Sequence, residues 1–118
     1  MDGRTDVGRR GEAAVERLYV SRGYRVVARN WRCRIGELDL VVERGATLVI
    51  CEVKTRRGAR FGGGYEAVDA RKRQKLRALA ETFRLQHPIA ASSIRFDVAS
   101  VLLRSDGSAA VELFDDAF

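Results

Sequence analysis

Cysteine and histidine, the residues that most often bind zinc, are scarce in this chain. Its 118 residues include two cysteines, Cys33 and Cys51, and a single histidine. A structural zinc site normally takes four Cys or His ligands, so this composition argues strongly against one. Counting alone leaves a disulfide open, but a cytoplasmic protein keeps its thiols reduced. We expect Cys51, which lies in an apolar run, to be a small core residue.

Long apolar segments are also missing. No stretch approaches the roughly 20 apolar residues that a membrane-spanning helix needs. The charged beginning of the sequence lacks the apolar centre of a signal peptide. We therefore expect a cytoplasmic protein with no membrane partner. The length, with 46% hydrophobic and 32% charged residues, predicts one globular domain over residues 1–118.

Positive charge is the main excess in the composition. The formal net charge is +6 and the isoelectric point is about 10.0. This balance favours polyanionic partners, chiefly nucleic acid. Lysine contributes little to it, because only three of the 22 basic residues are Lys. Each lysine position is therefore more informative than each arginine.

Hydrophobic periodicity predicts the order α-β-β-β-α-β-β in one mixed α/β unit. We expect the first helix at residues 9–22 and the second, with Asp69 as N-cap, running to about Leu85. The expected strands cover 24–29, 37–43, 47–55, 93–103 and 109–114. A turn region is expected at 30–36 and a glycine-rich loop at 57–66.

The two central strands form a hairpin whose register can be derived. With a two-residue turn at 45–46, paired residues have numbers that sum to 91. Asp39 then lies opposite Glu52, and Glu37 lies opposite Lys54. Because side chains alternate between the faces of a strand, all four groups share one face. A slip of one residue would destroy this arrangement.

Neighbouring carboxylates repel each other unless a cation joins them, and carboxylate oxygens suit Mg²⁺ or Mn²⁺. Asp39 and Glu52 are therefore the candidate metal ligands. The ammonium of Lys54 can orient an attacking water or stabilise charge on a phosphate. The alternative is an exposed hairpin face with weak salt bridges. Against it, Glu52 and Lys54 interrupt a run that has the pattern of a buried strand.

Two motifs carry a resemblance to a known family, and further matches extend it over nearly the whole chain. The motifs are Gly36-Glu37-Leu38-Asp39-Leu40-Val41 and Cys51-Glu52-Val53-Lys54-Thr55-Arg56. The sequence resembles the YraN-like family of small bacterial proteins, which is similar to archaeal Holliday junction resolvases and to PD-(D/E)xK nucleases. This resemblance implies a restriction-endonuclease-like fold.

The resemblance also implies a set of roles. Asp39 and Glu52 match the metal-binding acids, Lys54 matches the lysine of the nuclease motif, and Glu12 matches an acidic residue on the first helix. The implied activity is a Mg²⁺- or Mn²⁺-dependent endonuclease acting on structured or branched DNA. By analogy with resolvases, a homodimer is expected. The alternative is a catalytically silent nucleic-acid-binding or protein-interaction module on the same fold.

Several basic residues are candidates for contact with DNA phosphates. Arg71, Lys72 and Lys75 lie on the second helix, opposite its leucine stripe, and Arg56 follows the Lys54 strand. A solvated helix face is the alternative explanation for the helix residues. Glu37 is expected either to supplement the metal site or to pair with Lys54.

Three further side chains are expected to have structural roles. We predict that Asp97 forms a salt bridge with Arg95 or another arginine, that Trp31 is a packing anchor, and that His87 lies on the surface near the end of the second helix.

Overall fold

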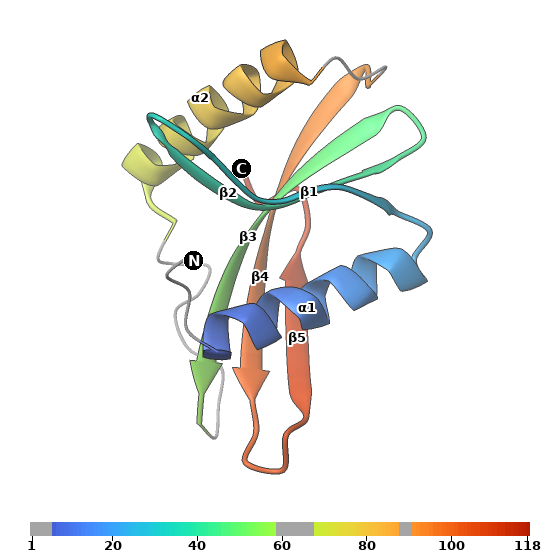
Figure 1. The fold of residues 1–118 in the computed structure, drawn as a ribbon, viewed down its shortest axis with the longest axis vertical. Coiled ribbons are helices and arrows are strands. Elements are labelled where there is room, and N and C mark those ends of the chain that lie inside the picture. Colours follow the sequence, from blue (N-terminus) through green and yellow to red (C-terminus); the bar gives the residue numbers. More distant parts are fainter. Residues whose placement is uncertain (1–5, 59–67, 88–90) are drawn as a thin grey trace.

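The structure is a computed structural model that describes residues 6–58, 68–87 and 91–118. In this part of the chain, two helices and five strands follow the predicted order (Figure 1). The elements are α1 (Asp6–Ser21), β1 (Arg25–Cys33), β2 (Gly36–Arg44), β3 (Thr47–Arg57), α2 (Ala70–Gln86), β4 (Ser93–Leu103) and β5 (Ala109–Phe114).

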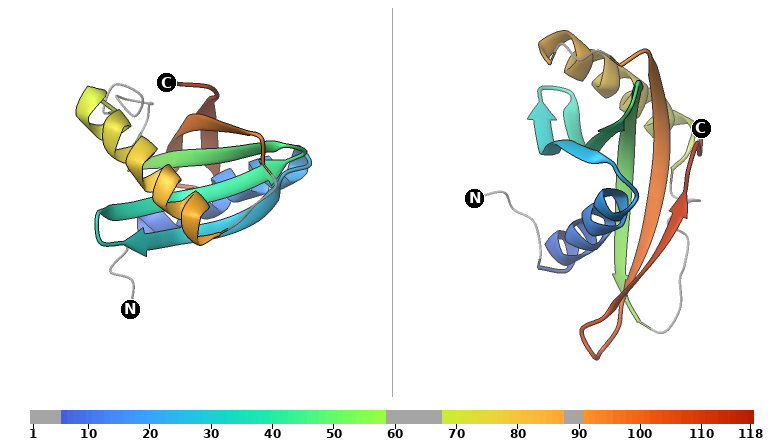
Figure 2. Two further views of the ribbon diagram at one scale, coloured as in Figure 1. Left: turned by 90° about the horizontal axis from the view of Figure 1, so that it is seen from above. Right: turned by 90° about the vertical axis from the view of Figure 1, so that its right-hand side faces the viewer.

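The strands form one mixed sheet in the order β1-β2-β3-β4-β5. All neighbours are antiparallel except β3 and β4, which run parallel over eleven paired residues. Parallel neighbours need a crossover connection, and α2 lies in it. The two helices pack on opposite faces of the sheet (Figure 2).

Each face of the sheet has its own core. On one face, Val15 and Tyr19 of α1 pack into a cluster with side chains of β2, β3 and β4. On the other face, Leu79 and Phe83 of α2 pack against β2, β3 and β4. Trp31 meets the Phe83 ring edge-on, with 5.3 Å between the ring centres, which confirms its predicted role as a packing anchor. A mixed α/β fold with a sheet between helices is therefore confirmed.

The predicted turn at 30–36 is wrong in extent, because β1 continues to Cys33. Asn30 takes a left-handed backbone conformation with φ of 49°, which asparagine tolerates better than most residues. The strand then resumes its pairing, with Trp31 opposite Leu38. Asn30 thus marks a local distortion within β1 and not the end of the strand.

Three other local predictions are confirmed. Asp69 caps α2, since its carboxylate accepts a hydrogen bond of 2.9 Å from the backbone N–H of Lys72. Cys33 and Cys51 are free thiols, and Cys51 is buried. His87 is exposed at the end of α2, where its ring stacks on that of Phe83.

The predicted salt bridge of Asp97 is also confirmed. Asp97 is fully buried and accepts two hydrogen bonds of 2.9 Å from the Arg95 guanidinium. It also accepts a bond of 2.5 Å from the Tyr19 hydroxyl and one from the backbone N–H of Asp116. Burial raises the pKa of Tyr19, and the nearby Cys51 and Asp97 raise it further, so this hydroxyl remains a donor. The network ties α1 to β4 and to the end of the chain.

Candidate active site

The site forms where β2 separates from β3. The hairpin has the predicted register, since its pairs run from Arg44 opposite Thr47 to Leu40 opposite Cys51. Backbone pairing between these strands ends there, so the predicted cross-strand pair of Asp39 and Glu52 is not formed. The predicted pairing of Glu37 with Lys54 is wrong, because the strands have already separated at that level. Glu37 instead forms an ion pair of 2.6 Å with Arg32 of β1.

Asp39 is the first residue of β2 past the separation. Its Oδ2 accepts a hydrogen bond of 2.9 Å from the backbone N–H of Val53, so a side chain replaces the missing strand pairing. Burial raises the pKa of Asp39 to about 7, and the charge of Glu52 acts in the same direction. The Val53 hydrogen bond opposes this shift, while the charges of Glu12 and Glu37 add to it. Asp39 thus lies in a buried position where neighbouring carboxylates disfavour its ionisation.

Glu52 lies beside Asp39 on β3 and is only 7% exposed. Two lysines neutralise it: its Oε1 lies 2.9 Å from Nζ of Lys72 and 3.4 Å from Nζ of Lys54. Burial alone would lower the pKa of Lys72, but the contact with Glu52 outweighs it and the net pKa is raised. The Glu52 side chain therefore lies between two ammonium groups.

Glu12 approaches Asp39 from the other side, on α1. The side-chain amide of Asn30 donates to Oε1 of Glu12 at 3.0 Å and to the backbone carbonyl of Asp39 at 3.4 Å. The helix can come this close because Gly11 has no side chain: a Cβ there would lie 1.8 Å from the Thr55 hydroxyl oxygen. One amide group thus bridges the helix carrying Glu12 and the strand carrying Asp39.

Asp39 borders two cavities. One, of about 210 Å³, is lined by Glu37, Asp39, Glu52, Lys72 and Lys75 together with two leucines of α2. The other, of about 360 Å³, includes Glu12, Asn30 and Asp39 in its lining. The carboxylate of Asp39 therefore links a cavity beside α2 to one beside α1. Both carry polar groups at the separation point of the sheet.

The structure thus pairs Glu52 with Lys54 and places Asp39 near Glu52, while Glu12 lies on the α1 side of Asp39 and is joined to it through Asn30. Arg56 and Arg71 are exposed, and no contact of either with the acidic residues is observed in the described part of the chain. The predicted loop at 57–66 lies almost entirely outside the described residues.

Lys72 differs from its prediction as an exposed phosphate contact opposite the leucine stripe, because its ammonium is paired with Glu52. The spacing of Lys72 from the leucines of α2 already indicated that it faces the sheet. Lys72 precedes Leu76 by four residues and Leu79 by seven, so it continues the apolar stripe that faces the sheet. The role of Asn30 had no comparable signal, since it depends on a distortion of β1.

The donor chemistry of the site fits a hard divalent cation, because Asp39 and Glu52 are neighbouring carboxylates and carboxylate oxygens suit such ions. Within residues 6–58, 68–87 and 91–118, however, no three acidic, His or Cys side chains stand close enough to hold a metal ion. Glu52 is instead paired with two lysines, whose ammonium groups lie where a metal cation would be attracted. Binding would require Glu52 to exchange these partners.

None of the described helices has the length and apolar character to cross a membrane.

Comparisons with known proteins agree on one family. Residues 11–101 match the sequence model of the uncharacterised protein family UPF0102. A UPF0102 protein of Frankia alni is 48% identical over all of this chain and 98% of its own length. UPF0102 proteins of Clavibacter michiganensis and Moorella thermoacetica are each 44% identical, covering 95% and 94% of this chain and 95% and 93% of their own lengths. The chain belongs to the UPF0102 family.

Proposed function

We propose that this protein is a metal-dependent endonuclease of the restriction-endonuclease-like fold, which hydrolyses phosphodiester bonds of structured or branched DNA. The observation that carries the proposal is the position of Asp39, Glu52 and Lys54 at the separation of two central strands. Two carboxylates and an ammonium are brought together there, and Glu52 is almost completely buried. Burying such groups costs free energy, which favours a functional reason for the cluster.

In this proposal Asp39 and Glu52 hold Mg²⁺ or Mn²⁺. The ion supplies positive charge that stabilises the phosphodiester transition state and makes a nearby water more acidic. Lys54 shares a cluster with Glu52 and supplies an ammonium for charge on the phosphate or for orienting the attacking water. Glu12, held by Asn30, adds a carboxylate on the α1 side. Lys72 holds the Glu52 side chain in an ion pair.

The basic residues around the cavity support DNA as the substrate class. Lys75 lines the same cavity as Asp39 and Glu52, and the exposed Arg71 lies one turn earlier on α2. Cationic side chains beside an acidic centre can hold phosphates that the carboxylates alone would repel. The net charge of +6 acts in the same direction.

A second candidate function is a catalytically silent nucleic-acid-binding module. The ion pairs of Glu52 with Lys72 and Lys54 favour it, because they satisfy this carboxylate without a metal. The two candidates differ in one measurable property, which is whether Asp39 and Glu52 bind a divalent cation.

The first experiment is therefore a titration of the protein with Mn²⁺, followed by electron paramagnetic resonance of the free ion. The wild type should bind Mn²⁺, while Asp39→Asn and Glu52→Gln should lose this binding. Asp106→Asn, in the exposed turn before β5, is the matched control and should bind as the wild type does. Lys72→Met should bind Mn²⁺ more tightly, because Glu52 then has one competing cation fewer.

Cleavage is tested with end-labelled four-way junctions, linear duplexes and single strands, each with Mn²⁺ or with EDTA. The wild type should cut the junction only with the metal. Asp39→Asn and Lys54→Ala should still bind the junction but not cut it. Equal cleavage by wild type and Asp39→Asn, or Mn²⁺ binding that survives both acidic substitutions, would refute the proposed centre.

A further inference from the structure

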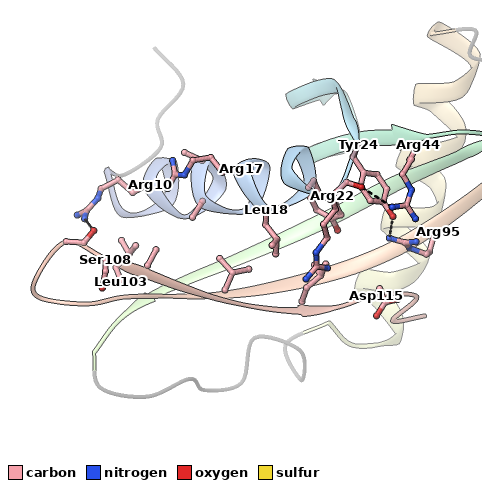
Figure 3. A pocket seen from close by; sticks show the side chains of 17 residues that line it. Arg10, Arg17, Leu18, Arg22, Tyr24, Arg44, Arg95, Leu103, Ser108 and Asp115 are labelled. Carbon is pink, nitrogen blue, oxygen red and sulfur yellow. Dashed lines mark hydrogen bonds between the residues drawn. The ribbon is translucent and has the colours of Figure 1, made fainter.

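A second surface, separate from the acidic site, lies along α1. It is a groove of about 1020 Å³ between α1 and the β4–β5 side of the sheet (Figure 3). Its lining includes none of the residues Glu12, Asp39, Glu52 or Lys54. We call it the arginine groove, because five arginines line it: Arg10, Arg17, Arg22, Arg44 and Arg95.

The arginine groove carries excess positive charge that its own lining does not neutralise. Asp115 is the only acidic residue among the described residues that line it. Arg95 is neutralised by the buried Asp97. In contrast, the guanidinium groups of Arg17 and Arg22 form no hydrogen bond or ion pair with another described residue. Both side chains are exposed.

The other arginines of the groove are held in place but keep their charge. Arg44 donates to the backbone carbonyl of Arg22 at 3.0 Å and lies over the Tyr24 ring, neither of which is an anion. Arg10 donates to the carbonyl of Gly107 and lies 3.9 Å from the exposed Asp6, a contact that water and salt weaken strongly. The groove therefore presents four usable cations around an apolar floor.

The shape of the groove favours a long anion. Arg10 and Arg17 are almost in line on α1, since seven residues make nearly two turns. From Arg10 to the end of α1 at Ser21 the helix advances about 17 Å, at 1.5 Å per residue, and Arg22 follows directly. This is about five times the 3.4 Å axial spacing of phosphates along a strand of B-form DNA. A single small anion would use only one part of this row.

We infer that the arginine groove binds the sugar–phosphate backbone of a nucleic-acid strand, without sequence preference. Guanidinium groups hold phosphate oxygens in forked pairs, and every nucleotide offers a phosphate. Leu18, Val111 and Leu113 give the floor apolar surface. Among the described residues that line the groove, only Tyr24 exposes part of an aromatic ring, and this small area lies under Arg44. Backbone contacts therefore dominate over base stacking.

Two other occupants agree less well with the structure. A second copy of the chain that docked groove to groove would bring two rows of arginines together, which is unfavourable. An acidic peptide would match the charge, but its carboxylates need not recur at regular intervals along this row of arginines. The groove lies on the α1 face of the sheet, whereas Lys72 and Lys75 lie on the α2 face. A branched nucleic acid could thus contact both faces.

The test is equilibrium binding of a fluorescein-labelled single-stranded DNA to the full chain, followed by fluorescence anisotropy in EDTA. EDTA removes the metal, so the result does not depend on the proposed hydrolysis. Arg17→Ala/Arg22→Ala is the test variant. Arg25→Ala/Arg84→Ala is the control, because it loses the same charge from exposed residues that already pair with glutamates outside the groove.

The groove variant should bind about tenfold more weakly, and the slope of log affinity against log salt should fall in magnitude by about 1.4, or 0.7 for each lost phosphate contact. The control should change affinity by less than about twofold, since it removes no phosphate contact. Equal losses in both variants, or no loss in either, would overturn the inference, provided that both unfold at the wild-type urea concentration.

Two further measurements test the identity of the occupant. Poly-glutamate that displaces the labelled strand as well as unlabelled DNA does would assign the groove to acidic peptides and overturn the inference. Sedimentation velocity that shows a wild-type dimer, converted to monomer by Arg17→Ala/Arg22→Ala, would assign it to a second copy. The inference expects weak competition and no effect of the variant on oligomeric state.

Discussion

The ionisation of Asp39 gives the most direct test of the acidic site in the absence of metal. The pKa of Asp39 is raised from an ordinary 3.8 to about 7 by burial and by the charge of Glu52. Between these values the folded chain holds the proton more tightly than the unfolded chain does. The free energy of unfolding should therefore fall as the pH rises from about 4 to about 7, and stay low above it.

The size of this effect follows from the shift. About three pKa units correspond to about 4 kcal/mol, at 1.36 kcal/mol per unit. This is an upper limit, because Asp39 is only partly buried and solvent can relax around its charge. We expect at least about 1 kcal/mol, which urea unfolding resolves easily. Asn at position 39 keeps an acceptor for Val53 but cannot ionise, so it should remove the pH dependence.

The assay is urea unfolding of wild type and Asp39→Asn from pH 4.5 to 8 in EDTA. The two proteins should have similar stability at the acidic end, and the variant should be the more stable one above pH 7. Asp106→Asn is a control of opposite sign, since hydrogen bonds from Ser108 lower the pKa of Asp106. Parallel pH curves for wild type and Asp39→Asn would refute the raised pKa of Asp39.

Three further predictions concern the fold around the site. Asp97→Asn should lower the free energy of unfolding by about 3 kcal/mol in urea, because it breaks a buried ion pair; a loss below about 0.5 kcal/mol would contradict the role assigned to it. Gly11→Ala should destabilise the chain by about 1–3 kcal/mol in thermal unfolding, because its methyl group would overlap the Thr55 side chain. An unchanged melting temperature would show that α1 can shift freely. Cys33 should react with a thiol reagent in the native protein and Cys51 only after unfolding, because burial raises the pKa of Cys51 and excludes the reagent. Equal labelling rates under native conditions would contradict that burial.

Much of the fold could be predicted because its local signals agree with its tertiary structure. The bounds of β4 and β5 are those expected from the sequence, and Asp69 caps α2 as predicted. These elements have strong periodicity or clear capping residues. The end of β1 was missed because Asn30 has the local preferences of a turn, whereas pairing with β2 carries the strand past it.

The site was predictable only as far as the hairpin register extends. Gly45 and Ala46 set that register, which pairs the strands as far as Leu40 and Cys51, the residues next to Asp39 and Glu52. The strands separate beyond Leu40, and no local pattern in the sequence predicts this separation. Helix periodicity places Lys72 on the side of α2 that faces the sheet, so its contact with Glu52 could be inferred. The contacts of Asn30 with Glu12 and Asp39 could not, because they depend on a distortion of β1.

The hydrogen bond from Val53 to Asp39 gives the site a built-in spectroscopic probe. Most amide protons of a central strand bond to backbone carbonyls of a neighbouring strand and report only on the sheet. This one bonds to a titratable side chain at the proposed metal position. Its chemical shift in a nitrogen–proton correlation spectrum should therefore follow the protonation of a single carboxylate. A cation or a phosphate arriving at the site should move the same peak, so ligands can be screened with no assumption about the reaction.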